Sequence, residues 1–189
     1  MLSVTEPRSS TLDAILRDQR DRDLSYPEVG ATRGTFPDGY RHARHAVELG
    51  AGDRAFLRGS DGLRRWQAHV RAGVVLRPPD AALQPEVTVV LTVPVVPVYV
   101  TVACRIVYVV EEPTRFGFAY GTLPHHAIDG EEAFLVERDD AGMVRFRISA
   151  FTRPRGALMR AVGPVVQLLD ERVVRRYLRA LEGHVGEQP

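Results

Sequence analysis

The densest cluster of ionisable side chains falls between two strand-like runs, and residues of these types could exchange protons with a substrate. His125, His126, Asp129, Glu131 and Glu132 lie within eight residues. A histidine titrates near neutral pH, so a histidine beside a carboxylate can accept a proton and return it. We therefore take His126 and Glu132 as candidate catalytic residues. The cluster matches no catalytic motif, so it identifies neither a reaction nor a substrate.

The same residue types could also bind a metal ion, because two histidines and one carboxylate suit zinc or iron. Adjacent histidines on a loop, however, cannot easily point at one ion. A strand also sends neighbouring glutamates to opposite faces. We therefore predict no metal site and no cofactor. A structural role, in which His126 and Glu132 fix the loop, stays open beside the catalytic one.

Composition excludes several classes of function. All 25 basic side chains are arginine, so lysine-based Schiff-base chemistry is absent. The net charge of +1 gives no long-range field, and acids interrupt the arginines near the C-terminus, so we predict no nucleic-acid partner. Cys104 is the one cysteine, which excludes an intramolecular disulfide and fits a reducing cytoplasm. The many Arg, Ala, Val and Gly residues are typical of a high-GC bacterium.

The apolar run from Val87 to Val110 has about the length of a membrane-spanning helix. Pro94, Pro97 and the excess of β-branched valine instead favour two buried strands joined by a turn. We therefore predict no membrane span.

The remaining pattern predicts an α+β fold, with a curved antiparallel β-sheet and one long C-terminal helix laid over it. The chain should form a single domain over 1–189, with an N-terminal helical arm (1–23), a core (24–182) and a flexible tail (183–189). The predicted elements are a helix from Ser10 or Thr11 to Arg22, a connector over 24–40, a strand over 41–49, a helix pair over 53–71 broken near Gly59 to Gly62, a loop over 74–86, strands over 87–93, 98–110, 115–122, 131–138 and 143–151, and a helix from Thr152-Arg153-Pro154 to about Leu181 that Pro164 should bend.

Alternation along the strands assigns their faces. We expect Glu132 on the same face as Phe134 and Val136. The other residues expected to share a face are Val98, Val100, Val102, Cys104, Ile106 and Tyr108 on one strand, Phe116, Phe118 and Tyr120 on the next, and Val144, Phe146 and Ile148 on the last.

Several motifs together resemble a known family. They are YPEVGAT from Tyr26, Trp66, FAYGTLPHHAIDGEEAF from Phe118, and AFTRP from Ala150. This pattern, from about Leu24 to Leu181, is similar to the DUF1990 (UPF0548) family, and the GTLP, His and GEEAF block is its most specific part. The chain departs from the family pattern at His125, where glycine is common, and from Leu91 to Tyr99, where glycines are absent.

The resemblance implies a helix-grip fold of the Bet v 1/START type, whose better-known members bind lipids, hormones or polyketides in a cavity. It implies no reaction. We therefore expect a hydrophobic or amphipathic small molecule to bind between the sheet and the C-terminal helix. The expected ligand-binding residues are Val100, Val102, Phe118, Tyr120 and Phe146 on the apolar wall, Glu132, His126 and Arg153 as polar contacts, and Tyr26 and Thr122.

Two alternatives remain open. The protein could be a cyclase-like or hydrolase-like enzyme that uses His126 and Glu132 as an acid–base pair. It could also be a structural or partner-docking protein without a ligand. The sequence does not indicate an oligomeric state.

Overall fold

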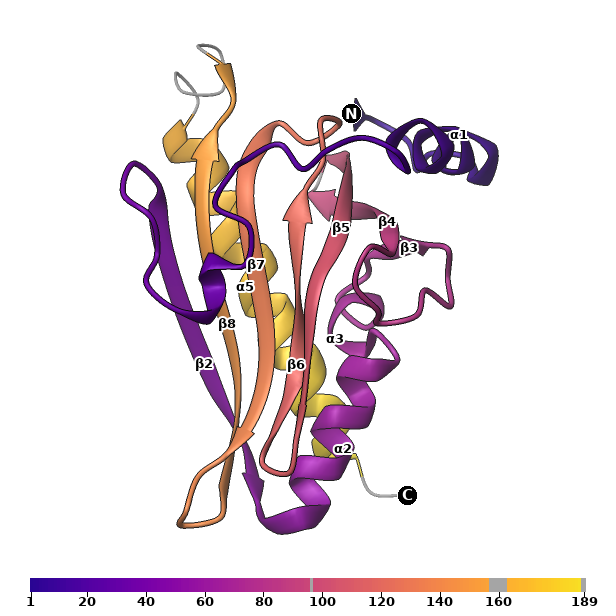
Figure 1. Ribbon diagram of the computed structural model, residues 1–189. Helices are drawn as coiled ribbons and strands as arrows, with labels where there is room; N and C mark the ends of the chain where they lie inside the picture. The colour runs from indigo at the N-terminus through magenta and orange to yellow at the C-terminus, as the bar shows by residue number, and fades with distance from the viewer. Residues whose placement is uncertain (96, 157–162, 188–189) are drawn as a thin grey trace.

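The computed structural model describes residues 1–95, 97–156 and 163–187, and it is built on one eight-stranded antiparallel sheet (Figure 1). The strands follow the order β2-β8-β7-β6-β5-β4-β3, and β1 pairs with β5 outside this path. Their bounds are β1 Leu2–Ser3, β2 Arg41–Ala51, β3 Val75–Arg77, β4 Thr88–Val95, β5 Val98–Glu112, β6 Arg115–Thr122, β7 Ile128–Arg138 and β8 Met143–Pro154.

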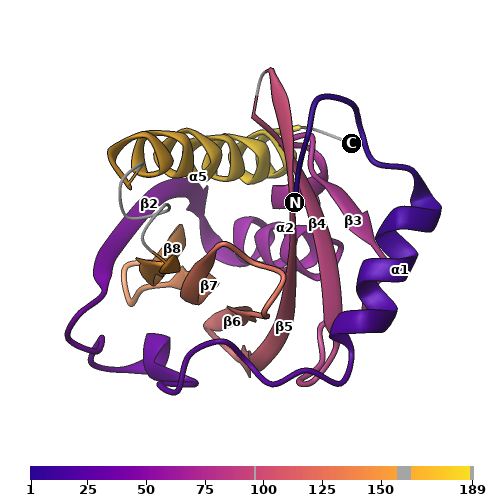
Figure 2. The same ribbon diagram turned by 90° about the horizontal axis from the view of Figure 1, so that it is seen from above.

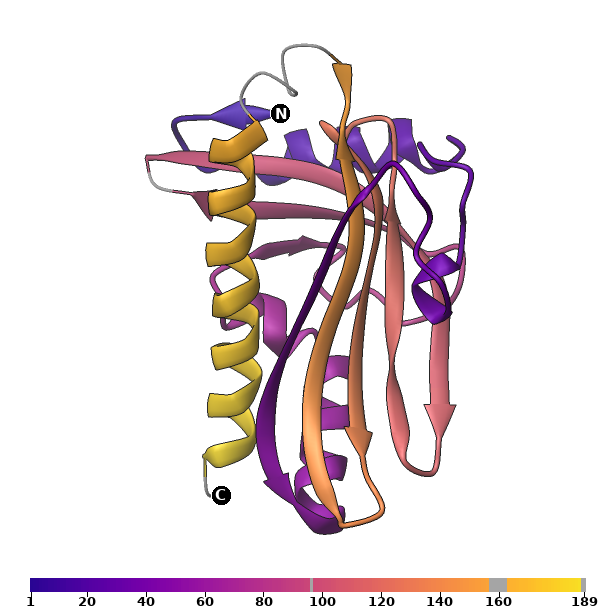
Figure 3. The ribbon, with the colours of Figure 1, turned by 90° about the vertical axis from the view of Figure 1, so that its left-hand side faces the viewer.

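The helices divide between the two faces of this sheet. The long α5 (Gly163–Gly186) contacts α2 (Gly52–Arg64) and α3 (Gln67–Val70) on the inner, concave face. Figures 2 and 3 show the strands curving around α5 and α2. Helix α1 (Ser9–Gln19) packs against β3, β4 and β5, and the short η1 (Ala31–Arg33) lies over β7 and β8 on the outer face. The predicted α+β helix-grip arrangement is confirmed.

Aromatic side chains fill the space between the sheet and the helices. Phe118, Phe134 and Phe146 project inward from β6, β7 and β8, and Trp66 and Leu181 meet them from the helical layer. The rings of Phe118 and Phe134 stack with centroids 5.3 Å apart. Each such buried ring removes a large apolar area from water and stabilises the fold. The alternation predicted for β6 and β8 is therefore confirmed.

One face assignment in β5 was wrong. A β-bulge shifts the register between Ile106 and Tyr108, so Val107 and Tyr108 both project to the outer face. Val102, Cys104 and Ile106 keep their predicted inward orientation. A bulge places two residues opposite one on the neighbouring strand, which reverses the alternation beyond it. Tyr108 consequently packs with Ala119 and Ala133 rather than in the main core.

The structure also corrects the predicted start of the C-terminal helix. Thr152, Arg153 and Pro154 continue β8, because they pair with Gly130, Asp129 and Ile128. Strand β7 accordingly begins at Ile128 instead of residue 131. Helix α5 continues to Gly186, so residues 183–186 belong to the helix and not to a tail. The expected bend at Pro164 depends on residues before Gly163, which lie outside the described ranges.

The helix pair breaks at a different place from the one predicted. Helix α2 runs unbroken through Gly59 and Gly62, and the break comes at Trp66, whose φ of 57° is left-handed. The two glycines permit close packing instead. A Cβ at Gly59 would lie 2.9 Å from Leu49, and a Cβ at Gly62 would lie 2.6 Å from Leu181. The predicted loop over 74–86 also contains β3.

The two strands predicted within the long apolar run are confirmed as β4 and β5. Among the described residues, no helix combines the length and apolar character needed to cross a membrane.

Candidate functional site

A chain of polar side chains crosses the otherwise apolar inner face of the sheet. Tyr120 on β6 and Glu132 on β7 are directly opposite each other in the antiparallel register. The Tyr120 hydroxyl donates a hydrogen bond of 2.9 Å to Glu132 Oε2. Glu132 therefore faces inward with Phe134 and Val136, as the alternation predicts. A carboxylate on an apolar wall is costly to bury unless polar groups surround it.

His69 on α3 extends this chain into the core. Its side chain is 0% exposed, and Nε2 lies 3.4 Å from the Tyr120 hydroxyl. Rings enclose the imidazole, with centroids 4.6 Å away at Tyr177 and 4.8 Å away at Phe134. Burial lowers the His69 pKa to about 3, so the ring is neutral at physiological pH.

The hydrogen-bond directions assign the tautomer of His69. Tyr120 donates its one proton to Glu132, so its oxygen is free to accept a bond from His69. The proton of the neutral ring then sits on Nε2, and Nδ1 carries a lone pair. Nδ1 is buried and has no hydrogen-bond partner among the described residues. Such an unsatisfied acceptor is uncommon in a protein interior and often marks a functional position.

Two further pKa shifts define the chemistry of this inner cluster, by which we mean His69, Tyr120 and Glu132. Burial and the nearby charge of Glu132 raise the pKa of Tyr120 well above its usual value, so the hydroxyl stays protonated. Burial, with a smaller effect of Glu132, also raises the pKa of the Cys104 thiol. Cys104 is therefore a protonated core residue and not an activated nucleophile. The inner cluster presents two acceptors, the carboxylate and Nδ1, linked by one hydroxyl.

The structure brings together six of the ten residues predicted to bind a ligand. Glu132 and five residues of the proposed wall face the interior between the sheet and the helices, although Val100 only packs against its edge. The six are Val100, Val102, Phe118, Tyr120, Glu132 and Phe146. Around His69 this interior is filled by rings, whereas Val95, Val98 and Val100 toward the β4–β5 turn are half-buried. Among the described residues, the valine-rich end is therefore the less buried part of the inner face.

Tyr26 lies on the opposite face of the sheet, where it fixes the connector to β7. Its hydroxyl donates to Glu131 Oε2 over 2.6 Å. The amides of Gly30 and Thr32 donate to the same carboxylate over 2.7 and 3.0 Å, and the Thr32 hydroxyl adds a short hydrogen bond. Glu131 is only 1% exposed. We call Glu131, Tyr26, Gly30 and Thr32 the outer anchor.

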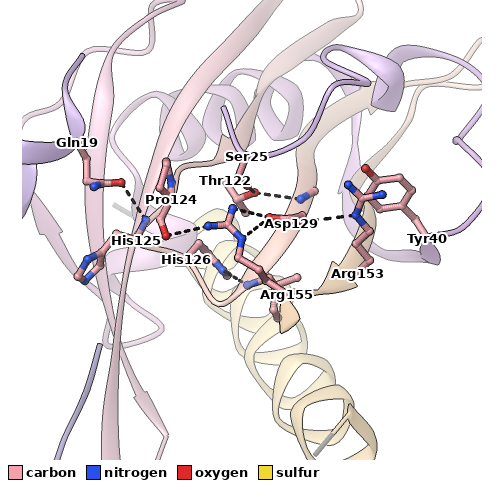
Figure 4. Close-up of polar contacts among 12 residues, drawn as sticks. Gln19, Ser25, Tyr40, Thr122, Pro124, His125, His126, Asp129, Arg153 and Arg155 are labelled. Atoms are coloured by element: carbon pink, nitrogen blue, oxygen red, sulfur yellow. Dashed lines mark hydrogen bonds and ion pairs between the residues drawn. The ribbon is translucent and has the colours of Figure 1, made fainter. Parts of the chain in front are cut away.

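The other three predicted ligand residues, Thr122, His126 and Arg153, lie at the end of the sheet near the β6–β7 turn (Figure 4). The Thr122 hydroxyl is 2.7 Å from that of Ser25 and accepts a bond from the Gly130 amide. The Arg153 guanidinium lies over the Tyr40 ring and 3.6 Å from Asp129. Thr122 and Arg153 thus hold the connector and the strand ends in place.

His126 caps its own turn. Its Nδ1 accepts a hydrogen bond of 3.0 Å from the Ile128 amide. Burial, followed by the positive charges of the N-terminal amine and Arg155, lowers the pKa of His126 to about 4. The structure records no hydrogen bond or ion pair between His126 and Glu132, which belong to separate networks. The pair predicted as acid and base is therefore not assembled.

Sequence reasoning missed His69 completely. The one signal was its position three residues after Trp66 in a short apolar helical segment.

Among the described residues, no group of three or more His, Cys, Asp or Glu side chains could hold a metal ion.

The comparison with known proteins decides the family. Residues 25–180 match the profile of a family described as "Domain of unknown function (DUF1990)". This chain belongs to the DUF1990 family. A UPF0548 protein of Deinococcus radiodurans is 34% identical over 98% of this chain and all of its own length. A UPF0548 protein of Arabidopsis thaliana is 30% identical over 79% of this chain and 75% of its own length.

Solved structures show the same fold at low sequence identity. The ZhuI aromatase/cyclase of a Streptomyces species superposes with a TM-score of 0.58 at 17% identity, covering 77% of this chain and 93% of its own. The Bet v 1/START-like helix-grip fold predicted for this DUF1990 protein is confirmed.

The structure also explains the most specific block of this DUF1990 sequence. Within GEEAF, the two glutamates point to opposite faces of β7, so one belongs to the outer anchor and the other to the inner cluster. Gly121, in the GTLP part, makes room for the connector, because a Cβ there would lie 2.2 Å from the Tyr26 hydroxyl. One short segment thus serves both faces of the sheet.

Proposed function

We propose that this DUF1990 protein binds a small hydrophobic or amphipathic molecule between the inner face of its sheet and α5. The observation that carries the proposal is the inner cluster, a carboxylate, a hydroxyl and a neutral imidazole set into an apolar wall. Small-molecule sites combine a mostly apolar lining with a few converging polar groups. The inner cluster supplies those groups, and the valines of β4 and β5 supply the lining.

The polarity of the cluster suggests which polar group the ligand carries. Glu132 accepts hydrogen bonds, and Nδ1 of His69 is an acceptor with no partner among the described residues. Leaving a buried acceptor unsatisfied costs about 1–3 kcal/mol, which a ligand donor would recover once binding displaces the rings that enclose His69. We therefore propose a ligand with a hydroxyl or amine donor on an apolar body.

The accessible end of the inner face suggests how the apolar body lies. Val95, Val98 and Val100 are half-buried there, whereas Val102 is almost completely buried. An apolar body along these valines would direct its polar end toward Tyr120 and Glu132. Of the residues predicted from the sequence, Tyr26, Thr122, His126 and Arg153 are not part of this proposed wall. A reducing cytoplasm suits the proposal, since the single cysteine is buried as a thiol.

A second candidate function is proton-transfer catalysis on the bound molecule. The favouring observation is the continuous chain from Glu132 through Tyr120 to His69, which could move a proton between its ends. The aromatase/cyclase that shares the fold is consistent with this proposal. The acid–base residues would then be those of the inner cluster, with His69 in place of His126.

Native mass spectrometry of protein isolated from its own host tests the binding proposal. We expect an apolar adduct that is released on unfolding and contains a hydroxyl or amine. Tyr120→Phe should reduce its occupancy, whereas Tyr108→Phe should not. These two tyrosines form a matched pair, because both are 7% exposed but they face opposite sides of the sheet. Equal occupancy in both variants, or no adduct in the unmodified protein, would count against the proposal.

A further inference from the structure

A hollow lies on the outer face of the sheet, away from the proposed ligand site. It has a volume of about 500 Å³ and is bounded by η1 and the residues after it, and by strands β5 to β8. Its lining includes Arg33, Phe36, Arg44, Tyr108, Ala133 and Ser149. Figure 1 views this face, with η1 over the upper part of the strands and α5 behind them. The volume falls within the range typical of small-molecule sites.

The strand register explains why this face is hollow. Five strands bring one residue each into a row of directly paired positions across the outer face. The row runs Arg44, Ser149, Ala133, Ala119, Tyr108. Long side chains occupy its two ends, and small ones occupy the three positions between them. Because opposed side chains on a sheet stand side by side, this order leaves a depression between the arginine and the tyrosine.

Charged residues close the lower side of the hollow, and their charges compensate one another. A second row of paired residues alternates in sign across the same five strands. It runs Glu48, Arg145, Glu137, Arg115, Glu112. Ion pairs join Arg145 to Glu48, and Arg115 to both Glu137 and Glu112. This second row, which we call the charge ladder, therefore offers little unpaired charge to a ligand.

Arg33 and Arg44, beside the hollow, differ from the ion-paired arginines of the charge ladder. The Arg33 guanidinium lies 4.0 Å from the centre of the Tyr108 ring, and that of Arg44 lies 4.2 Å from the centre of the Phe36 ring. Among the described residues, neither guanidinium forms an ion pair or a hydrogen bond. Stacking holds the flat face of a guanidinium and leaves its N–H edge free to bind an oxyanion in a forked geometry.

We propose that this hollow binds a planar organic carboxylate. Arg33 or Arg44, at either end of the depression, would bind the carboxylate group, and the flat body would lie over Ala133 and Ser149 between the aromatic rings. The charge complementarity favours this occupant, since the unpaired groups are all cationic donors. The inner cluster has the opposite preference because it presents acceptors. The two sites therefore lie on opposite faces of one sheet and select different ligands.

A nuclear magnetic resonance titration of the full chain with 2-naphthoate tests this proposal, with 2-naphthamide as the neutral comparison. With 2-naphthoate, we expect saturable chemical-shift changes at the backbone amides of Gly34, Tyr108, Ala133 and Ser149. With 2-naphthamide, the changes should be much weaker. Arg33→Gln combined with Arg44→Gln should weaken binding at least roughly tenfold, because each charge-assisted contact contributes on that scale.

Arg145→Gln is the matched control, because Arg145 lies on the same face but pairs with Glu48 and Asp139 and is outside the hollow. The affinity of the Arg145→Gln variant for 2-naphthoate should equal that of the unmodified protein. Ser149→Leu should abolish binding by filling the depression. Equal binding of the acid and the amide would overturn the proposal. Shifts at Val102 and Ala150 would also overturn it, since they would place the molecule on the inner face.

Discussion

Two adjacent glutamates on β7 experience very different surroundings. Glu131 faces outward and is almost completely buried, and hydrogen bonds from Tyr26, Gly30 and Thr32 reach both of its carboxylate oxygens. Glu132 faces inward, is half-buried and accepts a bond from Tyr120, whose own neighbour His69 has an unsatisfied nitrogen. The outer anchor is saturated by the protein itself, whereas the inner cluster still has an acceptor to offer.

This difference separates a structural role from a ligand-binding one. A buried charge whose acceptors are all used by the backbone and nearby hydroxyls stabilises the native state and has nothing left for a ligand. A cluster with an unused acceptor loses stability in the free protein and can regain it on binding. The outer anchor should therefore dominate stability, and the inner cluster should dominate ligand selection.

The largest expected effect is at the outer anchor. Glu131→Gln leaves one carbonyl oxygen where two carboxylate oxygens accepted bonds, and it turns an N–H group toward backbone donors. We expect the free energy of unfolding to fall by roughly 2–4 kcal/mol, measured by denaturant titration. Glu132→Gln should cost less, because Glu132 is only half-buried and the Tyr120 hydroxyl can still donate to an amide oxygen. An equal loss in both variants would contradict the division of roles.

A second substitution should disrupt the outer anchor through a steric clash alone. In Gly121→Ala, the new Cβ would lie 2.2 Å from the Tyr26 hydroxyl and 2.8 Å from its ring, so the tyrosine must move off Glu131. We expect a loss of about 1–3 kcal/mol in a thermal or denaturant unfolding experiment. Gly183→Ala on α5 is the control, because its Cβ would meet no atom within 4 Å. That variant should be neutral or slightly stabilised.

The pH dependence of stability examines the inner cluster. The folded-state pKa of His69, about 3, is below the usual value of 6.5. The unfolded chain therefore takes up a proton below about pH 6.5 while the folded protein does not, and stability falls as the pH falls through this window. Replacing His69 by Leu should reduce the slope near pH 5 by about 1.4 kcal/mol per pH unit. Chemical unfolding at several pH values measures this slope. An unchanged slope in the variant would show that His69 titrates normally.

The smallest expected effect is in the charge ladder. Arg145→Gln removes ion pairs to Glu48 and Asp139, but all three side chains are substantially exposed. Exposed pairs contribute little because water and salt screen them, so we expect a change of less than about 0.5 kcal/mol. A loss above about 1 kcal/mol in denaturant unfolding would mean that the outer face contributes to stability beyond its anchor.

The sequence predicted the features that depend on local periodicity. Apolar residues at every second position assigned Phe118 and Phe146 to the interior, and the same parity oriented Glu132. It could not predict the outer anchor, because Tyr26 and Glu131 are 105 residues apart and their contact depends on how the connector folds back. His69 was hidden for a related reason. Its position in the core depends on the left-handed turn at Trp66, which no periodic pattern reveals.

The hollow on the outer face was equally inaccessible from the sequence. Arg44, Ser149, Ala133 and Tyr108 form a row only when four strand registers are known together. A shift of one residue in any strand would place a different side chain in the row. Tyr108 shows the difficulty directly, since simple alternation assigned it to the wrong face.

The bulge in β5 reverses the alternation of side chains, so the inward-facing positions differ before and after Val107. Before Val107 the even-numbered side chains line the interior, as Val102 and Cys104 do, and after it the odd-numbered ones do, as Val109 does. Substitutions that alter the proposed wall and those that alter the outer hollow therefore follow opposite parity in the two halves of one strand. Deleting Val107 would remove the bulge and restore simple alternation, with Ile106 still inward, Tyr108 still outward and Val109 still inward. The bulge therefore adds one side chain to the outer face of β5 without changing which side chains of that strand line the interior.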